Sequence, residues 1–430
     1  MKNCILVFVV LSLLNPFAGA QEKSEFESLF NGKDLTGWYG LKTLDPRKMN
    51  AMNENQIAAL KAESDAATKK HWTVENDEIV NDGGGPYLTT EREFSDFELV
   101  LEYKTVAKAD SGIYMKATPQ IQIWDFTEAG GKWNIGADKG SGGLWNNSKG
   151  AAGKDPLVLA DKPFGQWNKI HVIQLGSRTT VYLNDKLVVD HAIMENYWNR
   201  KLPLVKSGPI QLQTHGGEIR WRNLKVRDIA PEEANKMLLS KHNEGFQSVF
   251  DGKSFEGWEG PTNNYEIKDG YLQCKKGAGG TIFTKEQYGD FQVRFEFNLP
   301  PAGNNGLAIR YPGKGYTAYV GMCELQVLND DYPSKLDDRQ YHGSAYGMVA
   351  ATRGYQRETG QWNFQEVTVR GSNIKVELNG SVILDCDLST VKDYLGSKPH
   401  PGQNRTKGHF GFAGHSDPVK FRNVMIKKLD

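Results

Sequence analysis

Hydrophobic and polar residues alternate along several segments of the chain. Phe291, Val293, Phe295 and Phe297 are separated by polar residues, and residues 97–103 repeat the pattern. A period of two places one face of a strand in a core and leaves the other face polar, as in antiparallel sandwiches. Such segments recur without interleaved helices, so the sequence predicts an all-β sandwich or jelly roll rather than a parallel sheet.

Three other segments carry local signals. Asn379 and Gly380 separate two apolar runs, and this dipeptide favours a two-residue hairpin turn. Residues 56–70 are rich in Ala, Lys and Glu and contain neither Gly nor Pro, which predicts a helix. The polar segment from Pro231 to Asn243 is expected to form a helical connector.

The second half of the chain repeats the first half, with the matched segments in the same order. The pairs are LFNGKDLTGW (29–38) with VFDGKSFEGW (249–258), FSDFELVLEY (94–103) with YGDFQVRFEF (288–297), DSGIYMK (110–116) with NNGLAIR (304–310), GQWN (165–168) with GQWN (360–363), and WRNL (221–224) with FRNV (421–424). An internal repeat of this length indicates two copies of one module.

The repeat and the length agree, because 430 residues suit two domains better than one core. We expect two tandem jelly-roll β-sandwiches at residues 21–230 and 245–430, separated by a helical linker at 231–244. The predicted helix at 56–70 is a short insertion that only the first module contains.

Residues 1–20 have the pattern of a signal peptide. Lys2 precedes an apolar run from Cys4 to Leu14, and a small-residue motif ends at Ala20. The sequence therefore predicts an exported protein, periplasmic or extracellular. No later stretch is long and apolar enough to predict a transmembrane segment.

Charge and cysteine content narrow the classes of partner and site. The 52 basic residues balance the 52 acidic residues, which argues against a nucleic-acid partner. Cys274, Cys323 and Cys386 follow the predicted signal peptide, and no C-x-x-C pair occurs. Buried free thiols are therefore expected rather than a zinc or redox motif.

The matched segments resemble the 3-keto-disaccharide hydrolase domain family. In the first copy the resemblance rests on LFNGKDLTGW, DSGIYMK, PQIQIWD (119–125), GSGGLWNN (140–147), GQWN and QLQTHGGEIRWRNLKV (211–226). The second copy keeps this frame but has CELQVLND (323–330) and GHSDPVKFRN (414–423) in the middle and closing segments. The resemblance implies a concanavalin A-like fold for both modules.

The resemblance also implies action on glycosides that carry a ketone at sugar carbon 3. Members are described as 1,2-lyases, often coupled to hydration of the product. A 3-ketone acidifies the hydrogen on carbon 2, so a base can remove it and the substituent on carbon 1 can leave. Such a site needs a base, a group that holds the enolate oxygen and an acid for the leaving oxygen.

One strand in each copy has polar residues at alternate positions. In the first copy Gln120, Gln122 and Trp124 alternate with isoleucines and Asp125 ends the strand, so these four residues are candidate substrate contacts. In the second copy Glu324 and Gln326 occupy the matching face. Glu324 replaces the amide of Gln120 and is a candidate catalytic base, although a solvated sheet face would have the same pattern.

One histidine is retained at the same position in both copies. His215 and His415 each precede the closing Arg-Asn pair, and each could be a base, a metal ligand or a turn residue. Lys116 and Arg310 follow equivalent Ser-Gly and Asn-Gly turns. Either could hold an enolate or a sugar hydroxyl, or could be an exposed strand charge.

A glycine-rich loop adds further candidates for sugar contact. In the first copy it ends in Trp145, suited to stacking on a pyranose, and Asn146; in the second copy His342 and Tyr346 take this place. Acidic loop residues leave a divalent metal such as calcium open, but no EF-hand spacing exists and no metal ligand is assigned.

These observations favour a glycoside-active lyase or hydrolase acting on 3-keto glycosides. A non-catalytic carbohydrate-binding protein is the alternative, and a third reading has one catalytic and one structural module. Endoglucanases with this fold use paired carboxylates on one strand. Here Gln120 and Gln122 stand where acids would be needed, and Glu324 is alone, which mildly favours elimination.

Overall fold

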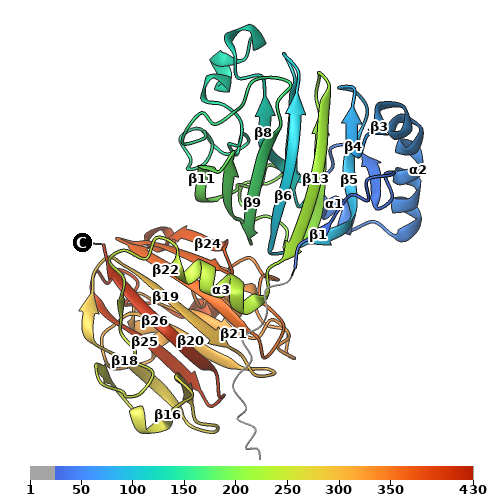
Figure 1. Ribbon diagram of the computed structural model, residues 1–430. Helices are drawn as coiled ribbons and strands as arrows, with labels where there is room; N and C mark the ends of the chain where they lie inside the picture. Colours follow the sequence, from blue (N-terminus) through green and yellow to red (C-terminus); the bar gives the residue numbers. More distant parts are fainter. Residues whose placement is uncertain (1–24, 430) are drawn as a thin grey trace, which may run out of the picture.

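The computed structural model describes residues 25–429, which form two β-sandwiches joined by a helix (Figure 1). The predicted signal peptide lies outside the described residues. Each sandwich contains one eight-stranded and one five-stranded sheet, and all strand pairs are antiparallel. The all-β prediction is therefore confirmed.

The first sandwich contains strands β1 to β13. Its larger sheet has, in spatial order, β11 (Lys186–Ile193), β10 (Arg178–Leu183), β9 (Asn168–Leu175), β6 (Phe97–Thr105), β13 (Ile219–Asp228), β4 (Glu78–Asn81) and β3 (Trp72–Glu75), with β1 (Glu27–Ser28) paired to β13. Its smaller sheet has β2 (Trp38–Leu41), β5 (Tyr87–Phe94), β12 (Gly208–Thr214), β7 (Asp110–Met115) and β8 (Thr118–Trp124).

The second sandwich contains strands β14 to β26. Its larger sheet has β24 (Ser381–Asp387), β23 (Asn373–Leu378), β22 (Trp362–Arg370), β19 (Phe291–Asn298), β26 (Lys420–Lys428), β17 (Tyr271–Cys274) and β16 (Tyr265–Lys268), with β14 (Gln247–Ser248) paired to β26. Its smaller sheet has β15 (Trp258–Glu259), β18 (Gly279–Tyr288), β25 (Gly408–His415), β20 (Asn304–Tyr311) and β21 (Cys323–Leu328). Strand for strand, this order repeats that of the first sandwich.

The alternating segments form the central strands of the larger sheets. In β19, Phe291, Val293, Phe295 and Phe297 are all fully buried in the second core. Phe97, Leu99, Leu101 and Tyr103 on β6 fill the first core in the same way. Burying each such side chain stabilises the fold by about 1.5–3 kcal/mol.

Two hairpin turns follow the predicted geometry. Leu378 pairs with Ser381, which leaves Asn379 and Gly380 as a two-residue turn in which both have positive φ. The first sandwich has the same turn between β10 and β11. This conformation matches the right-handed twist of the strands, and Asn and Gly adopt it at low cost.

The helical insertion is present in the first sandwich. Helix α2 (Glu54–His71) begins with a capping box between Asn53 and Gln56, and a shorter helix, α1 (Pro46–Asn50), precedes it. Helix α2 packs on β2 at one edge of the sandwich (Figure 1). The remaining helices are α3 (Pro231–Ser240), α4 (Thr317–Val320) and 3₁₀ turns at Glu128–Gly130, Trp133–Ile135, Ala137–Lys139, Thr262–Asn264, Asp338–Gln340, Leu388–Thr390 and Leu395–Ser397.

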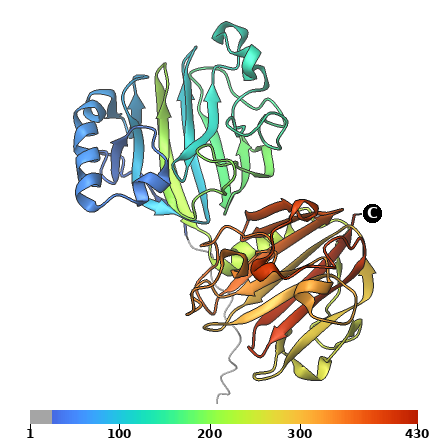
Figure 2. The ribbon, with the colours of Figure 1, turned by 180° about the vertical axis from the view of Figure 1, so that it is seen from behind.

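The connector is the helix α3, which lies between the two sandwiches in both views (Figures 1 and 2). Pro231 at its first position and two glutamates in its first turn favour helix initiation there. Its apolar face closes a small core, whose buried residues come from both modules and the helix: Leu175, Ile229, Ala234, Leu238 and Phe364. The connector is thus packed between the modules.

A buried ion pair joins the two larger sheets. The Arg178 guanidinium donates two hydrogen bonds to the Glu377 carboxylate, at 2.8 and 2.6 Å. Burial alone would raise the pKa of Glu377, whose side chain is only 3% exposed, but Arg178 holds this pKa below its ordinary value. Beside the pair, the Ser177 amide donates to the Gly380 carbonyl, so the turn between β23 and β24 rests on the first module.

Two further expectations concern membrane spans and cysteines. Within residues 25–429, no helix is long and apolar enough to cross a membrane. Cys274, Cys323 and Cys386 are free thiols, and burial raises the pKa of each.

The interface predicts a large stability loss from Arg178→Met. This variant leaves the Glu377 carboxylate buried without its charged partner, which typically costs about 3–5 kcal/mol. Urea denaturation would measure the free energy of unfolding. Glu63→Gln, which breaks the exposed pair with Lys42, is the control and should change stability by less than about 1 kcal/mol. Equal effects of the two variants would contradict a structural role for the buried pair.

Candidate functional site

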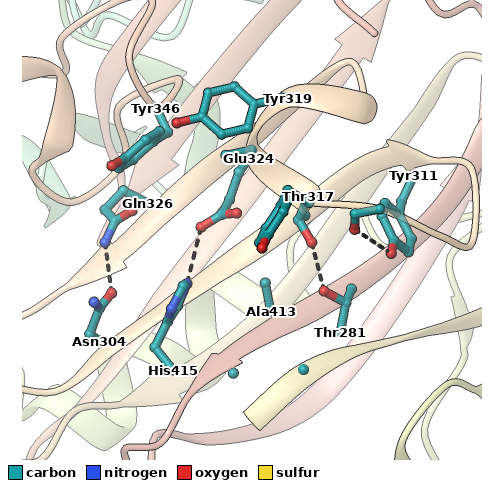
Figure 3. Close-up of a pocket in the computed structure, with 15 residues that line it drawn as sticks. Thr281, Asn304, Tyr311, Thr317, Tyr319, Glu324, Gln326, Tyr346, Ala413 and His415 are labelled. Carbon is teal, nitrogen blue, oxygen red and sulfur yellow. Dashed lines mark hydrogen bonds and ion pairs between the residues drawn. The ribbon is translucent and has the colours of Figure 1, made fainter. Parts of the chain in front are cut away.

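A pocket of about 620 Å³ lies on the smaller sheet of the second sandwich (Figure 3). Strands β18, β20, β21 and β25 form its floor, and α4 and neighbouring loops form its walls. The lining residues are Gly280, Thr281, Asn304, Tyr311, Gly315, Tyr316, Thr317, Ala318, Tyr319, Glu324, Gln326, Tyr346, Ala413, Gly414 and His415. Such a volume can hold a small sugar derivative.

Glu324 and His415 face each other across the pocket floor (Figure 3). His415 Nε2 lies 3.6 Å from Glu324 Oε1, and the side chains are 48% and 6% exposed, respectively. The interaction with Glu324 raises the pKa of His415, although partial burial acts in the opposite direction. The pair therefore combines a buried carboxylate with an accessible imidazole whose protonated form is stabilised.

Gly306 on β20 makes room for this carboxylate. A Cβ atom at Gly306 would lie 2.5 Å from the Glu324 carboxyl carbon and 2.6 Å from its Cγ. Leu325 and Val327, which alternate with Glu324, are buried in the core. The glutamate thus lies flat across its neighbouring strand, in a space that only glycine leaves open.

Amides, hydroxyls and tyrosine rings surround the pair. Gln326 donates to Asn304 at 2.8 Å, and the hydroxyl groups of Thr281 and Thr317 are 2.6 Å apart. Four tyrosines contribute to the walls, and Tyr316 is 83% exposed at the rim. Polar groups on the floor with aromatic rings around them suit a sugar, which has both hydroxyl groups and apolar faces.

The first sandwich has a pocket of about 440 Å³ in the equivalent place. Its lining residues are Thr43, Tyr87, Asp110, Tyr114, Pro119, Gln120, Gln122, Trp124, Lys132, Ile135, Trp145, Asn146, Tyr197, Gln213 and His215. Trp124 and Trp145 meet edge to face with their ring centroids 5.1 Å apart. The two tryptophan rings form a wall of the first pocket at a place where the second pocket has tyrosine rings.

Asp110 is the centre of a polar network in this pocket. Its Oδ2 lies 2.8 Å from His215 Nδ1 and also accepts from the Lys132 ammonium, while its Oδ1 accepts from Gln122 at 2.7 Å. Gln120 in turn donates to Gln122. A histidine therefore contacts a carboxylate in both modules, but the carboxylate comes from β7 in the first and from β21 in the second.

Most of the predicted site residues lie in one of the two pockets. Those in the first pocket are Gln120, Gln122, Trp124, Trp145, Asn146 and His215. Those in the second pocket are Glu324, Gln326, Tyr346 and His415. Their roles in substrate binding and catalysis remain predictions.

Lys116 and Arg310 do not line either pocket. Lys116 is fully buried and donates to the Gly176 carbonyl at 3.0 Å, and burial lowers its pKa to about 8. Arg310 donates to backbone carbonyls and to the Asp290 carboxylate. Both residues have positive φ, which interrupts strand alternation, so the expectation that they face the substrate is wrong.

Asp125 and His342 also serve the fold instead of lining a pocket. Asp125 accepts from the Thr127 hydroxyl and from the amides of Lys108 and Thr127, and these bonds hold its pKa below the usual value despite desolvation. His342 stacks on Phe297 in the core with ring centroids 4.9 Å apart, and burial lowers its pKa to about 3. The prediction of substrate contact for these two residues is corrected accordingly.

Several pocket residues were not identified from the sequence. Asp110 and Asn304 begin equivalent motifs, so this Asp-to-Asn difference between the copies was a usable signal. Lys132 comes from a loop, Tyr316 caps the short helix α4 and Tyr319 lies within it. Neither segment has a matched counterpart in the other copy, so no repeat signal marked these residues. Within residues 25–429, no group of three or more His, Cys, Asp or Glu side chains is placed to hold a metal.

The fold and the paired pockets define a tandem β-sandwich protein with a polar pocket on the smaller sheet of each module. The model of the 3-keto-alpha-glucoside-1,2-lyase-like domain family matches residues 25–227 and again residues 245–427. The chain therefore belongs to this family, and both copies are members of it.

Comparison with individual proteins gives more distant similarities. The chain is 25% identical to a 3-keto-disaccharide hydrolase of Bacteroides thetaiotaomicron, over 52% of this chain and 92% of that protein. A crystal structure from Parabacteroides distasonis, described as a "putative glycosyl hydrolase", has 22% identity and a TM-score of 0.38 and covers 47% of this chain and 99% of its own. A carbohydrate-binding module from Bacillus subtilis has 13% identity and a TM-score of 0.29, over 40% of this chain and 96% of its own.

The space above Gly306 leads to a test of the second pocket. Gly306→Ala should displace the Glu324 carboxylate and so lower the pKa of His415, as Glu324→Ala should by removing the carboxylate. NMR titration of the His415 ring would measure both effects. The double variant should show no further decrease, because the two changes act through one contact. An unchanged His415 pKa in Gly306→Ala would contradict this assignment.

Proposed function

We propose that the protein is an exported enzyme that cleaves 3-keto glycosides by elimination across carbons 1 and 2, with the pocket of the second module as a catalytic site. The observation that carries this proposal is the accessible imidazole of His415 beside the buried carboxylate of Glu324. Family membership supports the substrate class, and the motif at residues 1–20 supports export.

The reaction begins with proton transfer from carbon 2 of the sugar. His415, in its neutral form, takes the proton, and the electron pair of the C–H bond forms the enolate of the C3 ketone. Glu324 stabilises the resulting imidazolium, because opposite charges attract strongly where water is excluded. Asn304 lines the same pocket, and its amide group can donate to the C3 oxygen.

The C1–O bond then breaks. The enolate electrons return to form the C1–C2 double bond, the C3 carbonyl is restored, and the leaving oxygen takes the proton from His415. The products are a 2-hydroxy-3-keto-glucal and an alcohol or sugar, and the enzyme returns to its starting state. Addition of water to the glucal would give the free 3-keto sugar and complete a net hydrolysis.

Ordinary glycoside hydrolysis is less well supported by the pocket. Retaining and inverting enzymes usually place two carboxyl groups about 5–10 Å apart on either side of the bond. Among the described residues that line the second pocket, Glu324 is the sole carboxylate. Elimination needs only one base and an acidified C–H bond, so it fits the side chains present.

A non-catalytic carbohydrate-binding protein is the second candidate. The tyrosine rim and the amides of Asn304 and Gln326 would serve this function equally well. The His415–Glu324 pair distinguishes the two, because sugar binding alone does not require an imidazole with a stabilised protonated form.

The activity prediction uses a 3-keto-glucoside with a chromogenic leaving group. The full chain should release the chromophore. In a chain whose first pocket is silenced by His215→Ala, adding His415→Ala should lower kcat/KM by about 100-fold or more, because a positioned base contributes about 10²–10⁴-fold. His242→Ala, outside both pockets, is the control and should retain full activity. Glycan binding without release by the unmodified protein would favour the binding function.

The pH dependence provides a separate prediction. Neutral His415 is the active form, and its pKa is raised above the ordinary 6.5, so activity should fall as the pH drops through a value above 6.5. Glu324→Gln removes the charge that raises this pKa, so in the His215→Ala background the acid limb of kcat/KM should move to lower pH. The control Glu286→Gln breaks an exposed pair with Lys428 and should leave the limb in place. An unmoved limb in Glu324→Gln would show that another group controls it.

A further inference from the structure

The pocket of the first module contains a charged group that the second pocket lacks. Lys132 lines the first pocket and contacts Asp110, and its side chain is 30% exposed. The second pocket has no lysine or arginine among its described lining residues. Lys132 comes from the loop after β8, directly before the 3₁₀ turn at Trp133–Ile135.

The hydrogen bonds of Asp110 exclude it as the base of this pocket. Its carboxylate accepts from Lys132, from Gln122 and, at 2.8 Å, contacts His215 Nδ1. Three donors take three of the roughly four lone-pair sites of this carboxylate, and the donor charges stabilise its ionised form, so Asp110 is a positioning group. The contact through Nδ1 fixes the His215 ring and leaves Nε2 available, and this side chain is 62% exposed.

The floor beneath the network is built for buried polar groups. Gln120 and Gln122 are almost fully buried, and each takes part in the chain of hydrogen bonds that leads to Asp110. Gly112 permits this arrangement, because a Cβ atom there would lie 2.9 Å from Gln213 Oε1 and 3.2 Å from the Gln120 amide carbon. The two buried amides therefore connect the sheet to the Asp110 carboxylate by hydrogen bonds.

We infer that the first module is a second, independent catalytic centre, in which His215 is the base and Lys132 holds the enolate oxygen. This inference rests on the proposed function, since it assigns the same substrate class, 3-keto glycosides, to a second site. The inference contradicts the alternative hypothesis that one module is catalytic and the other is only structural. The two centres would differ in chemistry, because only the pocket of the first module has, among its described lining residues, a lysine that can hold the enolate oxygen.

The elimination at this centre begins at carbon 2 of the sugar. His215 Nε2 takes the proton from carbon 2, and the C–H electron pair forms the enolate, whose oxygen on carbon 3 is held by the Lys132 ammonium. The C3 carbonyl then reforms, the C1–C2 double bond forms, and the C1–O bond breaks. The leaving oxygen takes the proton from His215, so no other reactant is consumed.

The test starts from a chain in which the pocket of the second module is disabled. The Glu324→Gln/His415→Ala protein should still release the chromophore from the 3-keto-glucoside. Adding His215→Ala should abolish this remaining activity. Adding Lys132→Met should lower kcat by about 100-fold with little change in KM, as loss of one oxyanion donor does in other enzymes.

Lys139→Met is the matched control. Lys139 lies on the same loop, pairs with Asp155 and does not line the pocket, so its loss should leave the remaining activity unchanged. Lys132→Arg, which keeps the positive charge, should recover part of the kcat lost in Lys132→Met. Circular dichroism of each variant would show whether the sandwiches remain folded.

The outcomes separate this inference from the proposed function. If the unmodified protein is active and the Glu324→Gln/His415→Ala protein is inactive, the first module is not a catalytic centre, and the proposed function of the second module stands. If the unmodified protein is itself inactive, both fail. Equal losses in Lys132→Met and Lys139→Met would overturn the role of Lys132 while leaving His215 to be judged by its own variant.

Discussion

The alternation of side chains on β8 and β21 is the constraint on which both pockets depend. Ile121 and Ile123 face one core, and Leu325 and Val327 face the other, so the residues between them must lie on the opposite face of the smaller sheet. That face is covered by loops, and a polar side chain there is buried without belonging to the core. Such a side chain needs hydrogen-bonding partners and space. Glycines on the neighbouring strands, Gly112 and Gly306, supply the space.

The two modules satisfy this constraint with different side chains. In the second, a carboxylate on β21 lies over Gly306 and contacts His415. In the first, the same position is an amide, Gln120, and the carboxylate comes from Asp110 on β7. A carboxylate at both positions would place two like charges close together on a buried floor, which is costly. One carboxylate beside each histidine is therefore the arrangement that both sequences reach, by different substitutions.

Much of the architecture could be predicted from the sequence, because the period of two, the internal repeat and the Asn-Gly turn are local signals. The pocket floors followed from the same period. Lys116 and Arg310 could not be placed, since positive φ at each reverses the direction that alternation assigns. His342 lies in a loop, where no period applies, and packs on Phe297. Lys132 reaches Asp110 from a loop, through a tertiary contact that no sequence spacing encodes.

The position of the interface explains how the pockets could diverge within one chain. Contacts between the modules come from α3, from the turn after β9, and from β22 and the hairpin β23–β24. Hydrogen bonds from Lys206 to the Gln356 carbonyl and from Tyr355 to the Leu204 carbonyl join two loops as well. None of these contact residues lines either pocket. The pockets lie on the smaller sheets. The buried Arg178–Glu377 pair therefore makes no demand on the residues of either pocket floor. Because the residues that hold the modules together are not the residues that line the pockets, each pocket can acquire its own set of charges without losing the contact between Arg178 and Glu377.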